Sequence, residues 1–548
     1  MRKIFFNLVV IIFLLIPTSF SQKDSIRSII VMIPDGTSMS VLSLARWYKT
    51  FTTGEPTSLH VDPWLCGLVK THSSNAPIGD SAPTTSCYMT GYLSQTGFIS
   101  TYPPKTEQDL TPIDENRAYQ PLITLMEAAR IKLKKSIGLV FTSYLMDATP
   151  ADCAAHSYNR KYRDAIAKQM VHNQIDVVIG GGSQPIIPYV DFLKEEGYDV
   201  ILDNIDEFRH SKNPLTWAFF GNTEMPYNID RDTAEVPSLA EMTAVALKKL
   251  STNPNGFFLM VEGSKIDWAA HNNDTKTIIY EFLAFDEAVE VAINFAKNDK
   301  QTLVVILPDH GNSGIALGNT NSNKGYDKLS LTQIIEPITH HSVSAANMAD
   351  ILAKSQPEEI PQLFKKYYQI DISNEQQKEI ADALHYHLNK NISTEEKKVS
   401  LSLEKTITKI VNSNLYIGYT TYGHTGEDVF LALYHPYKQI QCGLITNVEV
   451  HHFLREALHL ENSIDSLTNE CFVPHQLLFQ SASQLKIDSI NPSTVQLHAV
   501  VGKSKIVVES YDNFIKINNQ PIKLSSVPIY VDKNRTFYLP REILRYLP

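Results

Sequence analysis

Imidazoles and carboxylates follow apolar stretches at several points of the chain, and their spacing could build a metal site. The segment VEGSKIDWAAH contains Glu262, Asp267 and His271. Asp267 and His271 are four residues apart, so on a helix both side chains would lie on one face and reach one cation. In LPDHG, the adjacent Asp309 and His310 end an apolar run. Mixed imidazole and carboxylate ligands are typical of catalytic zinc.

Two further segments offer one candidate ligand each. Asp35 ends an apolar run in IPDG, where an Asp-Gly turn alone is more often structural. His424 lies in the glycine-flanked turn YGHTGED, and a lone turn histidine is usually only solvated. Together, however, imidazole and carboxylate groups from distant segments favour a two-metal centre with an additional, harder ion. Two metals about 4 Å apart can stabilise the attacking and leaving oxygens of a phosphoryl displacement.

The segment APIGDSAPTTSC, residues 76–87, contains four hydroxyl groups that could act as a nucleophile. They belong to Ser81, Thr84, Thr85 and Ser86. Pro83 disfavours helical geometry at the preceding residue, which predicts a helix from about Pro83 to Thr90 that ends at Gly91. Ser81 would then stand just before the helix, where free backbone N–H groups favour phosphate. A simple helix cap at Asp80 or Ser81 explains the segment alone equally well.

The elements that must position these residues are predicted to be strands of one sheet. Continuous Val- and Ile-rich runs, without alternation, indicate strands buried on both faces, as in a parallel sheet. Helix-like segments lie between them, which predicts an α/β, doubly wound fold with a mostly parallel central sheet flanked by helices. In such sheets ligands bind beyond the carboxyl ends of the strands. The predicted strands cover residues 28–36, 136–143, 176–182, 257–264 and 302–311.

The 548-residue chain is long enough for one large domain with appendages. We expect the catalytic domain to cover residues 22–480. Polar, amphipathic segments with Ser or Asn caps predict a helical insertion over about 320–415. From residue 485 to 548, short alternating runs such as KIVVES and FIKINN predict a small β-rich C-terminal domain.

Residues 1–21 have the basic start, apolar run and small-residue cleavage site of a secretory signal peptide. We therefore expect an exported protein, periplasmic or extracellular. The apolar run is too short for a membrane span and the C-terminus lacks a lipid-anchor signal, so no membrane anchor is expected. The five cysteines are scattered and odd in number, and we interpret most of them as buried small hydrophobes. A net charge of -10 argues against nucleic-acid binding.

Seven segments, in order along the chain, resemble the alkaline phosphatase family. They are IPDG, GDSA, DATPADCAAHSYNR, DVVIGGG, VEGSKIDWAAH, LPDHG and GHTGED. The match extends from Ile29 to about Tyr434. The resemblance implies hydrolysis of phosphate monoesters through a covalent phosphoserine on Ser81. Members of the family are usually dimers, so it also implies a homodimer, although no residue of the sequence marks an interface.

Carried over position by position, the resemblance implies two zinc ions and one magnesium ion. The ligands of the first zinc would be Asp267, His271 and His424. Those of the second zinc would be Asp35, Asp309 and His310. Those of magnesium would be Asp35, Thr149 and Glu262. Arg160 would bind the phosphate, for which a guanidinium fork is suited. Asp147 would lie near the magnesium waters, and we interpret His156, in the same segment, as structural rather than ligating.

One position departs from the family in a way that bears on product release. Trp268 directly follows Asp267, where well-known members place Lys or His. An indole has one N–H and no charge, so it cannot make the ionic contact of a lysine to phosphate or to Asp147. The hypothesis is that this chain retains phosphate more weakly and releases it faster than the lysine form does.

Two other functions remain compatible with these residues. A phosphodiesterase, phosphonate hydrolase or sulfatase of the same metal-dependent superfamily would share the two-metal site, although Thr149 with Glu262 and Arg160 favours monoesters. A non-catalytic exported protein that binds metal or phosphate belongs to a different class, and the candidate nucleophile Ser81 argues against it.

Overall fold

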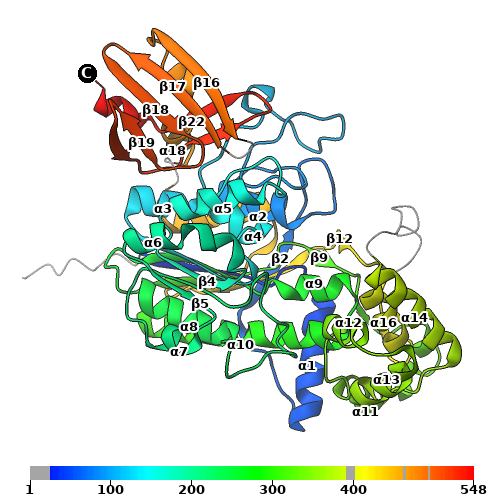
Figure 1. The fold of residues 1–548 in the computed structure, drawn as a ribbon. Coiled ribbons are helices and arrows are strands. Elements are labelled where there is room, and N and C mark those ends of the chain that lie inside the picture. The colour runs from blue at the N-terminus through cyan, green and yellow to red at the C-terminus, as the bar shows by residue number, and fades with distance from the viewer. Residues whose placement is uncertain (1–24, 390–401, 461–463, 492–493, 548) are drawn as a thin grey trace, which may run out of the picture.

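The computed structural model describes residues 25–547, apart from 390–401, 461–463 and 492–493. The expected signal peptide, residues 1–21, lies outside the described residues. Figure 1 shows a central sheet with helices above and below it, a group of helices at one side and a β-rich C-terminal region at the opposite end.

The central sheet has ten strands and is mostly parallel, as predicted. Strand β13 is antiparallel to both of its neighbours, β8 and β2, whereas the other paired strands of this sheet are parallel. In spatial order the strands are β14 (Gly443–Thr446), β2 (Leu65–Lys70), β13 (Val429–Tyr434), β8 (Thr302–Ile306), β1 (Ser28–Ile33), β7 (Phe257–Glu262), β3 (Ser136–Tyr144), β4 (Val177–Gly181), β6 (Thr216–Phe219) and β5 (Asp199–Leu202).

The middle strands are buried on both faces, which is why their sequences are continuous apolar runs. Every residue of β1, β7 and β8 is buried. Successive side chains of a strand point to opposite faces. Ile29 and Val31 therefore join the hydrophobic cluster on one face, and Ile30 and Met32 join the cluster on the other. The five strands predicted from such runs are all present.

Two layers of helices enclose the sheet (Figure 1). The helices of one layer are α2 (Ser81–Thr90), α3 (Leu125–Leu133), α4 (Ala148–Ala154), α5 (Arg163–His172), α6 (Val190–Glu195), α17 (Asn447–Ala457) and α18 (Ile464–Cys471). Those of the other are α1 (Met39–Thr53), α7 (Ile205–His210), α8 (Leu239–Leu250), α9 (Lys265–His271) and α10 (Thr275–Asp299). This arrangement confirms the doubly wound α/β fold.

The segment between residues 320 and 415 is helical where the structure describes it. Its helices are α11 (Leu331–Thr339), α12 (Ala345–Ala353), α13 (Ile360–Tyr368), α14 (Asn374–Leu388) and α16 (Leu403–Asn412). Residues 390–401 of the predicted helical insertion lie outside the described residues. Helices α12, α13, α14 and α16 share a hydrophobic core of their own. They also bond to the loop after α9: Asp274 accepts from the backbone N–H of Ala345, and Asn412 donates to the carbonyl of Asn273.

The C-terminal region contains two antiparallel sheets. One is formed by β16 (Gln484–Asn491), β17 (Thr494–Val501), β18 (Ser504–Glu509), β19 (Phe514–Ile517) and β20 (Gln520–Lys523). The other is formed by β15 (Val473–Pro474), β22 (Thr536–Leu539) and β21 (Ile529–Val531). Polar contacts hold these sheets against the layer that contains α5. Lys168 pairs with Glu509 at 2.5 Å, and the Tyr158 hydroxyl donates to Asp532 at 2.7 Å.

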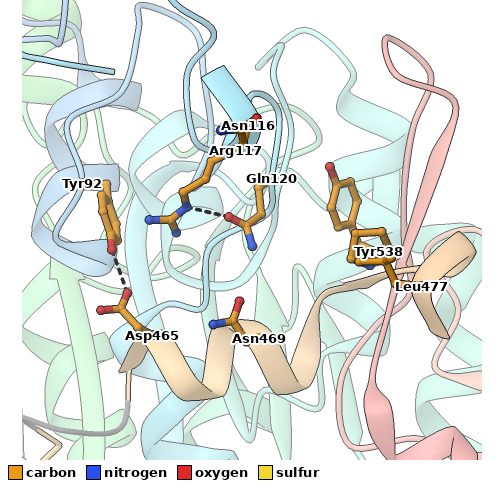
Figure 2. A pocket seen from close by; sticks show the side chains of 9 residues that line it. Tyr92, Asn116, Arg117, Gln120, Asp465, Asn469, Leu477 and Tyr538 are labelled. Carbon is orange, nitrogen blue, oxygen red and sulfur yellow. Dashed lines mark hydrogen bonds between the residues drawn. The ribbon is translucent and has the colours of Figure 1, made fainter. Parts of the chain in front are cut away.

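A polar cleft of about 470 Å³ lies where α18 and the C-terminal strands meet the segment before α3 (Figure 2). At one side the Tyr92 hydroxyl donates to Asp465 at 2.7 Å. The Arg117 guanidinium lies 4.5 Å from the centre of the Tyr92 ring and donates to Gln120 at 2.8 Å. The cleft is thus lined by groups that already bond one another.

A buried contact between a carboxylate and an imidazole fixes α3 against the chain after α4. The Glu127 carboxylate lies 3.2 Å from His156 Nε2, and both side chains are almost fully buried. His156 Nδ1 donates to the carbonyl of Ser100. Burial raises the pKa of Glu127, but the neighbouring His156 and hydrogen bonds outweigh it, so the pKa of Glu127 lies below its ordinary value. His156 is thus bonded to Glu127 and Ser100 and not to the candidate metal ligands.

Replacing Glu127 by Gln should lower the free energy of unfolding by about 2 kcal/mol at pH 7, because the buried carboxylate that accepts from Thr124 and Asn173 loses its charge-assisted hydrogen bonds. A carboxyl group whose pKa is depressed in the folded state stabilises above its unfolded pKa and loses that effect as the pH falls. The difference between wild type and Glu127→Gln should therefore shrink as the pH falls below about 4.5. The urea unfolding midpoints of wild type and Glu127→Gln at pH 7 and pH 4 measure this difference. The exposed Glu115→Gln is the matched control, and an equal loss in both variants would contradict the prediction.

Candidate active site

Three acidic residues meet where three neighbouring strands end. Asp35 follows β1 by two residues, Glu262 is the last residue of β7, and Asp309 follows β8 by three residues. Since β8, β1 and β7 are adjacent and parallel, their carboxyl ends lie at one edge of the sheet. Gly36 permits the close approach of α9, because its φ is +60° and a Cβ there would lie 2.4 Å from Asp267 Oδ1.

The helix that bears the candidate nucleophile begins earlier than predicted. Helix α2 starts at Ser81, with Asp80 in extended geometry as its N-cap, and it ends at Thr90 before Gly91 as predicted. The prediction of a start near Pro83 was wrong by two residues. A proline is accepted anywhere in the first turn, since the N–H groups there have no intrahelical partner. Ser81 is therefore the first helical residue rather than the one before it.

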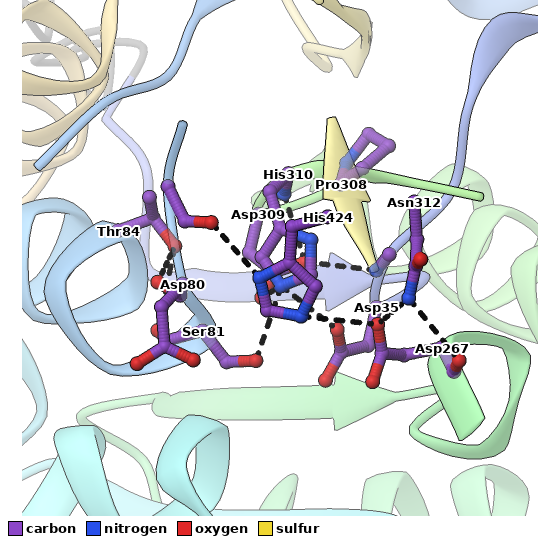
Figure 3. Close-up of polar contacts among 12 residues, drawn as sticks. Asp35, Asp80, Ser81, Thr84, Asp267, Pro308, Asp309, His310, Asn312 and His424 are labelled. Atoms are coloured by element: carbon purple, nitrogen blue, oxygen red, sulfur yellow. Dashed lines mark hydrogen bonds and ion pairs between the residues drawn. The ribbon is translucent and has the colours of Figure 1, made fainter. Parts of the chain in front are cut away.

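The Ser81 hydroxyl faces the histidines of the site (Figure 3). Its Oγ lies 3.2 Å from His310 Nε2, and the residue is only 5% exposed. Thr84, by contrast, turns its hydroxyl back to the carbonyl of Asp80 at 2.8 Å. The hydroxyls of Thr85 and Ser86 are buried within the packed helix layer. Of the four hydroxyls, the one that contacts the candidate ligands is that of Ser81.

Three histidines are oriented in the same way by the backbone. Nδ1 of His271 bonds the carbonyl of Tyr422 at 2.8 Å, Nδ1 of His424 bonds that of Gly79 at 2.9 Å, and Nδ1 of His310 bonds that of Gly311 at 3.1 Å. A carbonyl only accepts, so each Nδ1 carries the proton and each Nε2 keeps a free lone pair. Such bonding is typical of metal-ligating histidines.

The Nε2 atoms and the neighbouring carboxylates converge. His271 Nε2 lies 3.1 Å from His424 Nε2, and the His310 and His424 rings stack with centres 3.9 Å apart. Two groups offer ligand atoms that lie within 4.8 Å of one another. The first is Asp267, His271 and His424, and the second is Asp35, Asp267 and His310. Asp309 also approaches this second group, because its Oδ2 lies 3.3 Å from His310 Nε2.

Several oxygens of the cluster are buried and lack a hydrogen-bond partner among the described residues. They are Oδ1 of Asp35, Oγ1 of Thr149, both carboxylate oxygens of Glu262 and Oδ2 of Asp309. Burial and the surrounding carboxylates, Asp309 first, raise the pKa of Asp35 well above its ordinary value. Burial and Asp147 raise the pKa of Glu262. Hard, unpaired oxygens beside imidazole lone pairs are the donor set that divalent cations require, so these residues fit metal binding.

The pKa values of Asp267 and His310 shift in the directions that favour their charged forms, unlike those of Asp35 and Glu262. Burial raises the pKa of Asp267, but His271 and the other histidines outweigh it and lower the pKa below its ordinary value. Burial lowers the pKa of His310, but Asp309 and Asp267 outweigh it and raise the pKa. Neighbouring imidazoles thus hold the pKa of Asp267 low, whereas burial and neighbouring carboxylates raise the pKa values of Asp35 and Glu262.

Arg160 and two acidic residues line the open side of the site. The guanidinium donates to Asp80 at 2.9 Å and to Asp147 at 2.8 Å, and these partners raise its pKa although burial opposes them. A pocket of about 420 Å³ lies between these groups and the histidines. Its lining comprises Asp80, Ser81, Tyr144, Asp147, Arg160, Asp267, Trp268, His271 and His424. The Trp268 ring lies 6.0 Å from the Tyr144 ring.

Two residues of the site were not predicted in these roles. Asp80 was considered only as a helix cap, yet its carboxylate bonds Arg160 and the backbone N–H of Gly97 instead. Asn312 donates to Asp267 Oδ1 at 2.6 Å and so orients that carboxylate. The sequence signal for Asn312 was its position three residues after Asp309, in a segment rich in Gly and Ser. That position does not indicate which carboxylate Asn312 would bond.

Comparison with known proteins identifies the fold and the family. The model of the alkaline phosphatase family matches residues 26–460. The chain belongs to the alkaline phosphatase family. It is 33% identical over 444 residues to alkaline phosphatase 3 of Bacillus subtilis, covering 78% of this chain and 88% of that protein.

Solved structures of alkaline phosphatases agree with this assignment. The cold-active enzyme of a psychrophilic Shewanella has a TM-score of 0.66 at 26% identity, covering 79% of this chain and 99% of that chain. The enzyme of Thermus thermophilus has a TM-score of 0.69 at 23% identity, and the match covers 80% of this chain and 92% of that chain. The predicted family and fold are confirmed, and the C-terminal strands from β16 onward lie beyond the residues that the family model matches.

As a member of this family, the chain is an enzyme, a metal-dependent hydrolase of phosphate monoesters. The structure brings the predicted residues Asp35, Ser81, Asp267, His310 and His424 together (Figure 3). Among the described helices, none combines the length and the apolar character that a membrane crossing requires.

Replacing Glu262 by Gln should stabilise the metal-free protein and reduce the further stabilisation that added metal ions give. Both carboxylate oxygens are buried and make no hydrogen bond to the described residues, and a neutral side chain removes a repelled charge, which should raise the free energy of unfolding by about 1–2 kcal/mol at pH 7. The measurement is the urea midpoint of chelator-treated protein, with and without added zinc and magnesium salts.

Glu127→Gln is the matched control for this variant, because Glu127 is equally buried but is paired with His156. The two substitutions should change the stability of the metal-free protein in opposite directions. A loss of stability in metal-free Glu262→Gln comparable to that in Glu127→Gln would contradict the unpaired state of Glu262.

Proposed function

We propose that the enzyme hydrolyses phosphate monoesters in two steps through a covalent phosphoserine on Ser81, with two zinc ions and one magnesium ion in the site. The observation that carries this proposal is the position of Ser81. Its Oγ lies at the start of α2, 3.2 Å from His310 Nε2, and faces the pocket that Arg160 lines. A helix N-terminus favours an anion at this place.

The donor sets divide between two kinds of cation. Asp267, His271 and His424 would hold one zinc, and Asp35, Asp309 and His310 the other, since imidazole with carboxylate suits zinc. Asp35, Thr149 and Glu262 supply oxygen donors only and would hold magnesium, near Asp147. When bound, such ions lower the pKa of the serine hydroxyl and of water and stabilise oxyanions.

The chain's own residues bind and orient the reacting groups. Ser81 Oγ forms the new bond to phosphorus while the ester P–O bond breaks and the alcohol departs. Water then breaks the Ser81–phosphate bond, which returns the serine hydroxyl and releases inorganic phosphate. Arg160, fixed by Asp80 and Asp147, presents N–H groups to two phosphate oxygens, where charge collects in the transition state.

Replacing Ser81 by Ala should lower kcat for an aryl phosphate monoester by about a thousandfold or more, because the nucleophile is lost. Metal content, measured on the same preparation, should stay at the wild-type value, which separates this effect from misfolding. Acid quenching during wild-type turnover should yield a peptide phosphorylated at Ser81.

The control is Ser86→Ala, which removes a buried hydroxyl without a partner from the same helix and should leave kcat unchanged. A wild-type rate in Ser81→Ala would overturn the covalent mechanism. An aryl phosphate diester hydrolysed faster than the monoester would instead favour a phosphodiesterase.

Replacing Trp268 by Lys should strengthen inhibition by inorganic phosphate roughly tenfold, because an ammonium group would add attraction on the Asp147 side of the pocket. If product release limits turnover, kcat should fall in parallel. Trp268→Phe, which stays apolar and uncharged, should leave the phosphate inhibition constant near the wild-type value. An unchanged constant in Trp268→Lys would refute faster release in the tryptophan form.

We also propose that the enzyme is exported after removal of residues 1–21 and acts as a homodimer. Residues 22–480 would form the catalytic domain and residues 485–548 the appended β-rich domain. The N-terminal sequence of enzyme recovered outside the cytoplasm tests the first point, and its mass in solution tests the second.

A further inference from the structure

Two cysteines from distant parts of the chain lie side by side at the edge of the central sheet. Cys66 belongs to β2, and Cys442 directly precedes β14, the outermost strand, which pairs with β2. The backbone N–H of Cys442 donates to the carbonyl of Cys66 at 3.0 Å. Their sulfur atoms lie 3.7 Å apart, although 376 residues separate them in sequence.

The other three cysteines differ in burial. Cys87, Cys153 and Cys471 are buried, whereas Cys66 and Cys442 are partly exposed. The odd total of five thus divides into one facing pair that solvent reaches and three enclosed thiols. Enclosed cysteines behave as small hydrophobic groups, so the reactive chemistry is confined to the pair.

The backbone leaves room for the two sulfur atoms to meet. Gly67 follows Cys66, and a Cβ at this position would lie 3.0 Å from the Cβ of Cys442 and 2.3 Å from the carbonyl oxygen of Gly443. A side chain there would push the two strands apart. Disulfide sulfurs lie about 2 Å apart, so the two sulfur atoms must approach each other further when the bond forms.

We propose that Cys66 and Cys442 form an intramolecular disulfide by exchange with a disulfide oxidant, such as an oxidised dithiol protein or oxidised glutathione. One cysteine thiolate attacks the oxidant, forms a mixed disulfide and releases the first reduced thiol. The other thiolate attacks the protein sulfur of that mixed disulfide and releases the second. The two cysteines are oxidised, the oxidant disulfide is reduced, and the two cysteine protons end on the departing thiols.

The bond would join β2 to the start of β14 at the edge of the sheet, just before the chain enters the helix layer. Strand β14 leads directly into α17, where Asn447 donates to the carbonyl of His72 at 3.0 Å. His451, also in α17, contacts the carbonyl of Tyr88 in α2 at 3.2 Å. Since α2 begins at Ser81, the disulfide fixes the element that packs behind the candidate nucleophile.

Burial, together with Cys442, raises the pKa of the Cys66 thiol to about 12. Exchange proceeds through the thiolate, so it should be slow at neutral pH and accelerate as the pH rises. The oxidation rate of reduced protein in a glutathione buffer should increase several-fold for each pH unit between about 7 and 9.

The decisive experiment counts thiols in the full chain. The enzyme is produced with its own N-terminal segment, recovered from the exported fraction, incubated with oxidised glutathione, quenched in acid and alkylated after denaturation. Three thiols should react instead of the five that the sequence contains, and reduction should restore five. Peptide mapping should find Cys66 joined to Cys442.

Matched serine variants distinguish the pair from the enclosed cysteines. Cys442→Ser should form no intramolecular disulfide, and Cys66 should be found as a free thiol or as a mixed disulfide with glutathione, because the thiol that would resolve it is lost. Cys471→Ser should show two reactive thiols, because the pair remains intact. Five thiols in the oxidised wild type would overturn the proposal. So would a wild-type disulfide that joins another pair, or a wild-type Cys66 that is found only as a mixed disulfide with glutathione.

Discussion

The structure depends on a group of buried acids that the protein itself compensates only in part. Asp35, Glu262 and Asp309 are 3% exposed or less, and in the described part of the chain the salt-bridge partner of Asp35 and Asp309 is His310. Burying neighbouring carboxylates costs folding free energy, and the raised pKa values of Asp35 and Glu262 express that cost. Bound cations would remove it, which links the stability of this enzyme to the metals that its family requires.

The order of the strands follows from this constraint. The three acids follow β8, β1 and β7, which are neighbours in the middle of the sheet, where the surrounding strands and helices resist the repulsion between them. The short antiparallel pair of β9 (Gly311–Asn312) and β12 (His424–Thr425) then delivers His424 to the same place. The helices of residues 331–412 lie in the chain between these two strands, so a large insertion is accommodated without separating Asp309 and His310 from His424.

Patterns with a local physical cause were predicted well from the sequence. Middle strands are buried on both faces, so their apolar runs and the acidic residues after them are visible without a structure. Strand β2, second from the edge of the sheet, has only Val69 buried and carries no such run. The pairing of Asp80 with Arg160 joins residues 80 positions apart through two loops, and no spacing rule reports a contact of that kind. The start of α2 was misjudged because proline constrains the first turn only weakly.

The surroundings of Arg160 determine how strongly the site can hold its product. The guanidinium is already bonded to two carboxylates, so an arriving phosphate meets a group whose charge is largely compensated. Trp268, which lines the pocket beside Tyr144, adds no charge, and Lys265 is turned away to the carbonyl of Met225. In the proposed mechanism, phosphate would therefore be held mainly by cations bound to the carboxylates and histidines. Arg160 would orient the phosphate and the metals would supply most of the attraction, so metal loading would control affinity for substrate and product together.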